Sequence, residues 1–467
     1  MRKGLGYRSA LKGRSPDGGT QTVVAESGHM AISLVRNATL IDGTGAAPLR
    51  DAVVLVKDGR IEAVGHADRI EVPPGAIDDI DAAGGCLLPG LIDAHVHLVI
   101  EGINLARDMA TPFSMRFYQS VEHMRRTLDA GVTTVRDAGG ADAGLKQAVD
   151  SGVVPGPRVQ ISIAVLTITG GHVDFWMRSG NEFRLFPPYP GFPDGRCDGV
   201  DGVRQRVREV LRAGADVIKV CATGGVLSPT DHPEFTQFSP EELEVIVREA
   251  AYRRGTRVMA HAQGVEGIKN ALRAGVQSIE HGIYLDDEAI ELMIERGVFL
   301  VPTLLAPVAV LEIGERGGMA DHAVDKAREV IDAHRDSISR AHKAGVKIAM
   351  GTDAGVMPHG TNLRELGLMV DIGLTPMEAI VATTRTAAEC LGWQDRIGTI
   401  EQGKIADLVI TKTDPLRDIR SLADTSNIVL VMKEGKVMKD LRGGPGRSGP
   451  LPHSGVDLDA TIAYANG

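Results

Sequence analysis

The sequence predicts an α/β protein in which a (β/α)8 barrel of the TIM type carries a small β-sandwich domain built from both chain ends. Eight short apolar runs recur between residues 87 and 353, and helical patterns separate several of them. Short alternating runs typical of β-strands lie on both sides of this region. No Gly-x-Gly-x-x-Gly turn follows the first apolar run, so a barrel fits better than an open doubly wound sheet.

The first residues stand apart from the predicted fold. Residues 1–29 are basic and rich in Gly and Ser, and they lack the apolar segment of a secretory signal. The Ser27-Gly28-His29-Met30 junction resembles a vector remnant. We therefore expect residues 1–29 to be a tag or a disordered extension, with Met30 as the natural start.

Residues 30–88 are predicted to form the N-terminal part of the β-sandwich. Asp58-Gly59 separates two of its runs and predicts a hairpin turn, because glycine tolerates a positive φ. The expected strands are residues 32–35, 52–56 and 61–64.

Residues 89–395 are predicted to form the barrel. Ser239-Pro240-Glu241-Glu242 is a good helix start, because Ser can cap the first turn and the acidic residues lie near the positive end of the helix dipole. We expect helices over residues 240–254, 266–274 and 286–296. The expected strands are residues 87–97, 131–137, 158–163, 216–220, 257–261, 278–281, 298–302 and 347–353.

The C-terminal end repeats the β pattern of the N-terminal end. Residues 396–440 are predicted to complete the sandwich, with strands over residues 407–410, 428–432 and 436–438 and a turn at Glu434-Gly435. Residues 441–467 are rich in Gly, Pro and Ser, so we expect a flexible tail.

Composition restricts the possible partners and the compartment. The chain of 467 residues has 51 basic and 61 acidic residues, a net charge of −10, so nothing points to a nucleic-acid or anionic-membrane partner. The four cysteines lie far apart and form no Cys-x-x-Cys pair, which is compatible with a reducing compartment. No apolar run approaches the roughly 20 residues that span a bilayer. We expect a cytoplasmic protein.

Polar residues end several of the predicted strands, and barrel active sites lie at such C-terminal strand ends. His95 and His97 end the first run, and residues two apart on a strand point to the same side. Neutral imidazole is a common metal ligand, so a bound metal would explain why so many polar groups converge. The other members of the group are Lys219, His261, His281 and Asp353.

Lys219 is the unusual member, because an ammonium group is costly to bury and cannot bind a metal. Two interpretations are open on the residues alone. The side chain can extend to the barrel mouth or pair with an acid. Alternatively, desolvation lowers its pKa, and the neutral amine adds CO2 to form a carbamate that bridges two metals.

Five motifs together resemble the amidohydrolase superfamily, and the resemblance covers nearly everything from Met30 to Asp440. It implies that His95, His97 and Asp353 hold one divalent metal and that His261 and His281 hold another, with zinc as the expected metal. Carboxylated Lys219, a CO2-derived carbamate, and a hydroxide are expected to bridge them. The motifs are Pro89-Gly90-Leu91-Ile92-Asp93-Ala94-His95-Val96-His97, Val217-Ile218-Lys219, Met259-Ala260-His261-Ala262, Ile279-Glu280-His281-Gly282 and Gly351-Thr352-Asp353-Ala354.

The resemblance also implies catalytic roles for Asp353 and His172. Two metals lower the pKa of the bridging water, so that hydroxide attacks the carbonyl, and Asp353 passes the proton to the leaving nitrogen. His172 in Thr169-Gly170-Gly171-His172 is expected to hydrogen-bond the carbonyl oxygen as it becomes an oxyanion. A loop histidine without a role is the alternative.

Aromatic residues gather in the loop after the third strand. Six of the chain's 17 aromatic residues lie within 18 residues there, so the loop can close an apolar site over a hydrophobic group. A self-packed surface loop or an oligomer contact is the alternative. The substrate-binding candidates are His172, Phe175, Trp176, Val356 and His359.

Among amidohydrolases the chain most resembles the prolidase and Xaa-Pro carboxypeptidase-like branch, which includes ochratoxin-type amide hydrolases. We expect amide hydrolysis of an N-acyl amino acid or an Xaa-Pro or Xaa-Phe type substrate, by a homo-oligomer as is common in that branch. Gln263 departs from the tyrosine of some dipeptidase relatives and leaves dipeptide specificity open. The alternatives are a cyclic-amide hydrolase, a deaminase, which Lys219 argues against, and a metal-binding protein without catalysis.

Overall fold

The computed structural model describes residues 32–74, 77–102, 104–177 and 179–442. The expectations for residues 1–29 and for residues 443–467 of the tail lie outside this part of the chain. Among the described helices, none combines the length and the apolar character needed to cross a bilayer.

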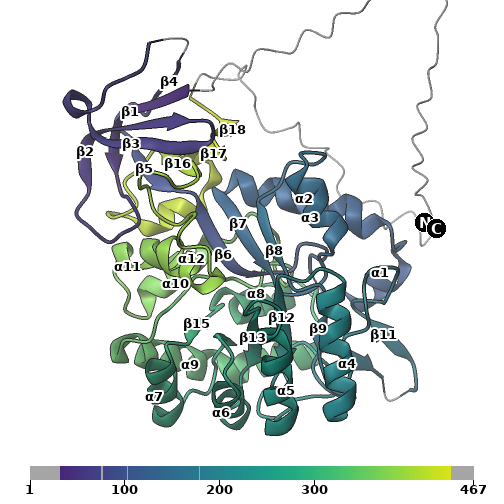
Figure 1. Ribbon diagram of the computed structural model, residues 1–467. Coiled ribbons are helices and arrows are strands. Elements are labelled where there is room, and N and C mark those ends of the chain that lie inside the picture. Colours follow the sequence, from purple (N-terminus) through teal and green to yellow (C-terminus); the bar gives the residue numbers. More distant parts are fainter. Residues whose placement is uncertain (1–31, 75–76, 103, 178, 443–467) are drawn as a thin grey trace, which may run out of the picture.

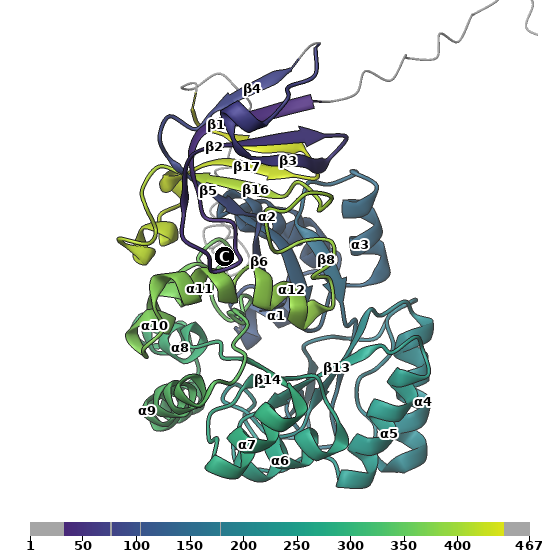
Figure 2. The same ribbon diagram turned by 60° about the vertical axis from the view of Figure 1, so that its left-hand side comes forward.

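Strands from the two chain ends lie side by side in one sheet, as predicted, and Figure 2 shows the purple N-terminal strands next to the yellow C-terminal ones. The order is β18-β17-β16-β5-β1-β2-β3, with β4 paired to β1. They form one connected eight-stranded sheet, and a sandwich of two sheets is not confirmed. The strands are β1 (Ile32–Leu40), β2 (Leu49–Lys57), β3 (Arg60–His66), β4 (Asp78–Asp81), β5 (Cys86–Pro89), β16 (Leu408–Thr411), β17 (Ile428–Lys433) and β18 (Lys436–Asp440).

Gly90 divides the first predicted barrel strand into two strands of different sheets. β5 pairs with β1 and β16, whereas β6 (Leu91–Val96) pairs with β7 (Val132–Asp137). A Cβ atom at Gly90 would lie 2.1 Å from Oγ1 of Thr133, so only glycine fits where the chain passes between the sheets. The prediction of one strand over residues 87–97 is therefore wrong at this point.

The middle of the chain forms two parallel sheets, which Figure 1 shows in blue and teal. The first has the order β6-β7-β8, and the second β15-β14-β13-β12-β9. The register places the buried side chains of Ile218, Ala260 and Leu300 on one face of the second sheet, whereas the opposite face carries Lys219, His261 and Glu280. The remaining strands are β8 (Arg158–Ile161), β9 (Val165–Leu166), β12 (Val217–Cys221), β13 (Arg257–Ala262), β14 (Ser278–His281) and β15 (Phe299–Val301).

The last predicted barrel strand, residues 347–353, is not a strand. Its backbone still bonds to both neighbours: the Ala349 amide donates to Leu300 of β15, and the Asp353 amide donates to His95 of β6. Asp353 has a φ of 64°, so the chain leaves the extended conformation where it reaches β6. The structure shows TIM-type α/β architecture, but it does not show a closed barrel.

The predicted helices are present with small changes at their ends. α5 (Pro240–Ala251) starts with a capping box between Ser239 and Glu242, and α6 (Val265–Ala274) and α7 (Asp287–Arg296) follow. A short hairpin of β10 (Asp174–Trp176) and β11 (Glu182–Arg184) lies in the loop that follows β9 and holds the six aromatic residues, hereafter the aromatic loop. The other helices are α1 (Leu105–Ala110), α2 (Met115–Asp129), α3 (Ala143–Asp150), α4 (Gly199–Arg212), α8 (Leu305–Glu315), α9 (Asp321–Ala344), α10 (Arg364–Asp371), α11 (Pro376–Ala382) and α12 (Arg385–Leu391), with short 3-10 turns at Ala67–Arg69, Ile419–Ala423 and Thr425–Asn427.

Candidate metal centre

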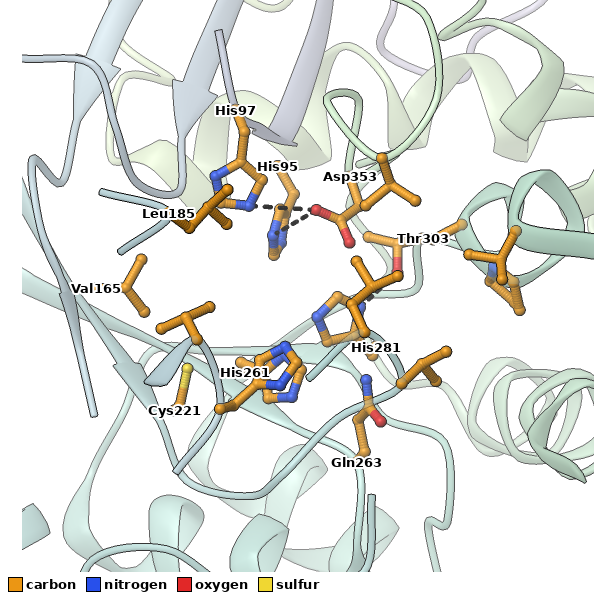
Figure 3. A pocket seen from close by; sticks show the side chains of 18 of the residues that line it. His95, His97, Val165, Leu185, Cys221, His261, Gln263, His281, Thr303 and Asp353 are labelled. Carbon is orange, nitrogen blue, oxygen red and sulfur yellow. Dashed lines mark hydrogen bonds and ion pairs between the residues drawn. The ribbon is translucent and has the colours of Figure 1, made fainter. Parts of the chain in front are cut away.

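His95, His97 and Asp353 meet where the end of β6 faces residues 347–354. Oδ1 of Asp353 lies 3.5 Å from Nε2 of His95 and 3.3 Å from Nε2 of His97 (Figure 3). Both histidines point to the same side because they are two residues apart on an extended chain. The structure thus brings together the three residues expected to share one metal.

Two more histidines face this group from the ends of β13 and β14. The ring of His281 has its centroid 5.2 Å from that of His95 and 4.6 Å from that of His261. Nζ of Lys219, on β12, lies 3.5 Å from Nε2 of His95. Ligand atoms of His95, His281 and Asp353 all lie within 4.8 Å of one another, close enough to hold one ion. All six predicted ligands therefore lie around one space.

Each of the four imidazoles uses one ring nitrogen for a hydrogen bond to the protein. This leaves Nε2 of His95, His97 and His281, and Nδ1 of His261, for a ligand. Metal-binding histidines in proteins have this arrangement, because the second bond fixes the tautomer and the ring orientation. The bonds join His95 Nδ1 to Glu280 Oε2 (2.7 Å), His97 Nδ1 to the Gly139 carbonyl (2.8 Å), His281 Nδ1 to Thr303 Oγ1 (2.7 Å) and His261 Nε2 to the Gly224 carbonyl (3.0 Å).

The protonation states of the buried groups also suit a metal. Burial lowers the pKa of His261 and of His281, so both rings are neutral and have a free lone pair. Burial likewise lowers the pKa of Lys219, which favours the neutral amine that reacts with CO2. Burial alone would raise the pKa of Asp353, but the hydrogen bond with His97 and the electrostatic attraction of His95, His97 and Lys219 together lower it, and the carboxylate stays ionised. The donor set therefore fits divalent cations.

Two members of the group have strained backbones. His281 has a φ of 73° and Asp353 a φ of 64°, in the left-handed region that side chains rarely adopt. Such a conformation costs about 1–3 kcal/mol, and it persists where the surroundings fix it, often at functional sites. Both residues lie at the end of a parallel segment. The left-handed backbone conformation directs their side chains toward the space around which the six predicted ligands lie.

A cavity with apolar walls opens from these polar groups. At its base lie the predicted ligands, together with Cys221, Gln263 and Thr303 (Figure 3). His172 and His334 also line it, and the rest of the wall consists of aliphatic and aromatic side chains from several loops and helices, so the cavity suits a largely hydrophobic ligand. They are Ile100, Val165, Val173, Phe175, Leu185, Phe186, Val226, Leu227, Ile283, Ala306, Pro307, Val310, Val330 and Val356.

The structure brings some of the predicted substrate-binding residues to this cavity and leaves others away from it. His172, Phe175 and Val356 line it. Trp176 is 47% exposed and does not belong to the lining. His359 is buried outside the lining, where its ring stacks on His123.

The aromatic loop is divided in the same way between the cavity and the protein surface. Phe186 stacks on His97 at the cavity, with ring centroids 5.9 Å apart. Tyr189 instead packs against Phe192, Phe113 and Phe117. Of the six aromatic residues in the predicted cover, two, Phe175 and Phe186, line the cavity, and the other four do not.

Residues outside the predicted set also hold the centre together. Glu280 bonds to His95, Thr303 bonds to His281, and Asp231 bonds to Nδ1 of His172 at 3.0 Å. Glu280 was visible in the sequence beside His281, but its partner lies on another strand. No sequence signal connects Asp231 or Thr303 to a histidine far away along the chain.

Comparisons with known proteins agree with this geometry. The model of the amidohydrolase family matches residues 86–438. Ochratoxinase from Aspergillus niger is 34% identical over 440 residues, covering 91% of this chain and 89% of the relative. A crystal structure of a Xaa-Pro dipeptidase with bound methionine has a TM-score of 0.79 at 35% identity, covering 87% of this chain and 99% of that one.

A prolidase complexed with N-methylphosphonate-L-proline is similar as well. Its TM-score is 0.81 at 36% identity, covering 88% of this chain and all of that one. The family match begins at β5 and includes every predicted ligand. This chain therefore belongs to the amidohydrolase family.

Proposed function

We propose that the protein hydrolyses the amide bond of an N-acyl amino acid or of an Xaa-Pro or Xaa-Phe type substrate, including ochratoxin-type amides. The observation that carries the proposal is the convergence of six potential ligands at the base of an apolar cavity. The relatives support it, since one is an ochratoxinase and others are a Xaa-Pro dipeptidase and a prolidase.

Two divalent metals, with zinc as our first candidate, are part of the proposal. His95, His97 and Asp353 would hold one ion, and His261 and His281 the other, with Lys219 as a carbamate shared between them. Such ions supply Lewis acidity that makes hydroxide available near pH 7.

The chain's own residues then account for binding and proton transfer. Asp353 can take a proton and deliver it to the leaving nitrogen, because its ionised carboxylate is the only acidic group on the described cavity wall. His172 lines the cavity 4.3 Å from the stacked ring of His261, a place from which it can contact the scissile carbonyl. Phe175 and Phe186 would grip an apolar side group and exclude water.

A substrate panel with metal analysis tests this function. The panel should contain an N-acyl-phenylalanine, an Xaa-Pro dipeptide, a cyclic amide and an aminopurine, each assayed with purified, metal-loaded protein. We expect turnover of linear amides with a hydrophobic group and about two metal ions per chain. Turnover of the cyclic amide or release of ammonia alone would instead support the alternatives within the family, and metal without any turnover would support a binding protein.

A further inference from the structure

A buried aspartate holds the histidine that we place beside the scissile carbonyl. Oδ2 of Asp231 lies 3.0 Å from Nδ1 of His172, and the Asp231 side chain is 1% exposed. The same oxygen accepts a hydrogen bond from the Gly225 amide at 3.1 Å. Oδ1 faces Nζ of Lys326 at 3.3 Å. The carboxylate is therefore fixed on both sides.

Lys326, on helix α9, ties the loop that carries this aspartate. Its Nζ donates to the backbone carbonyls of Gly225 (3.0 Å), Ser228 (2.7 Å) and Asp231 (2.7 Å). These three residues lie in one loop between β12 and α5. One ammonium group thus balances the buried Asp231 charge and fixes the loop backbone, since an isolated buried carboxylate would be unstable.

The loop packs directly on the ring of His172. A Cβ atom at Gly225 would lie 2.4 Å from Cε1 of His172, so only a glycine leaves room for the ring. The ring also stacks on His261, with centroids 4.3 Å apart and planes 19° apart. Oγ of Ser228 adds a contact of 2.9 Å to Nδ1. The ring therefore has little freedom to rotate.

The partners also determine which nitrogen of His172 faces the substrate. An ionised carboxylate only accepts hydrogen bonds, so the proton between His172 and Asp231 belongs to Nδ1. Nε2 is then the ring atom left for the substrate. Rotation of the ring by half a turn would bury Nε2 against Asp231 and remove it from the cavity.

We propose that Asp231 is the positioning residue of His172, held in place by Lys326, and that it presents Nε2 of the ring to the scissile amide. This rests on the proposed amide hydrolysis. An Asp-His pair of this kind fixes tautomer and orientation in other hydrolases, where the matching Asp to Asn change costs about 10⁴-fold in kcat. The role needs the carboxylate and acts only through His172.

A double-mutant cycle tests the coupling, using whichever amide of the panel is turned over. We expect Asp231→Asn to lower kcat by about 10²-fold with a small change in KM, and to have almost no further effect in a His172→Ala background. Asp231→Glu should restore part of the rate. Equal losses in both backgrounds, or a loss confined to KM, would overturn the proposal.

Asp198→Asn is the matched control. Asp198 anchors the segment that carries His172. Its carboxylate accepts hydrogen bonds from the amide (3.0 Å) and the hydroxyl (2.7 Å) of Thr169, without touching His172. We expect this variant to keep kcat within about threefold. A loss as large as that of Asp231→Asn would show that anchoring of the segment, rather than the Asp231–His172 pair, sets the rate.

Ring nitrogen NMR tests the same pair without any assay of activity, so its result is independent of the proposed function. Protein labelled with ¹⁵N-histidine should give a His172 signal, identified by its loss in His172→Ala, with a protonated Nδ1. In Asp231→Asn this signal should move toward the other tautomer or to a mixture. An unprotonated Nδ1 in the unmodified protein would contradict the proposal, even if the enzyme hydrolyses amides as expected.

Discussion

Nδ1 of His95 lies 2.7 Å from Oε2 of Glu280, and both side chains are almost completely buried. The other oxygen of Glu280 accepts hydrogen bonds from Arg136, at 2.9 Å, and from Ser278. Because Arg136 and Ser278 fix the carboxylate, Glu280 fixes the proton of His95 on Nδ1. The lone pair of Nε2 is thereby directed toward Asp353 and Lys219.

Replacing Glu280 by glutamine should weaken metal binding. The amide can donate as well as accept, so it no longer enforces the tautomer of His95. Loss of such a partner typically costs about 10- to 100-fold in metal affinity. Competition with a coloured chelator measures this, and Glu249→Gln, which removes a buried carboxylate bonded to Arg208 instead, serves as control. Unchanged affinity in Glu280→Gln would contradict the role of Glu280 in directing Nε2 of His95 toward a metal.

Asp353→Asn should abolish turnover while the protein stays folded. The two side chains have nearly the same volume, but the amide cannot accept the proton destined for the leaving nitrogen. We expect kcat to fall by at least about 10³-fold, measured together with circular dichroism and metal content. Near-normal rates would rule out Asp353 as the proton carrier.

Lys219→Ala should cost one metal ion per chain, because the group expected to bridge the two ions is removed. Elemental analysis would then find about one ion where the unmodified protein has two. Short carboxylic acids such as acetate or propionate should restore part of the activity, since a carboxylate can stand in for the carbamate. Full metal content in Lys219→Ala would favour the ion-pairing interpretation of this lysine.

Because His359 is buried, we expect the free energy of unfolding of the protein to depend on pH. Burial, reinforced by the neighbouring His123, lowers the pKa of His359 to about 3. The unfolded chain binds a proton below about pH 6.5, whereas the folded chain does not until near pH 3. The contribution of this residue to the free energy of unfolding therefore decreases as the pH falls below 6.5, by up to about 1.4 kcal/mol per pH unit.

Denaturant unfolding of His359→Gln and of the unmodified protein checks this prediction. Glutamine keeps a donor for the Ile100 carbonyl, which His359 bonds at 3.0 Å, but it does not titrate. The stability advantage of the unmodified protein should therefore shrink as the pH falls from 6.5 to 4. A difference that stays constant over this range would contradict the prediction.

The sequence predicted most of the strands, and it selected six candidate ligands that lie close together in the structure, because both depend on local patterns. Apolar runs and a polar residue at each run's end placed His95, Lys219, His261 and His281 on the correct segments. The same patterns do not say which sheet a run joins, so the division of one run at Gly90 was missed. That division follows from the close approach of Thr133, a contact between distant segments.

The rest of the site depends on contacts that no single segment encodes. Asp231 and His172 are 59 residues apart, and their pairing needs the loop path set by Lys326. The prediction of substrate-facing aromatic residues reached the correct loop, but it could not tell which side chains turn inward. Phe186 faces the cavity, whereas Trp176 points to solvent.

Metal removal and return test the central claim most directly. Protein dialysed against a strong chelator should lose both its metal and its amide hydrolysis, and about two equivalents of zinc or a similar divalent ion should restore both together. Hydrolysis that continues at an undiminished rate in protein shown to be free of metal would contradict the account.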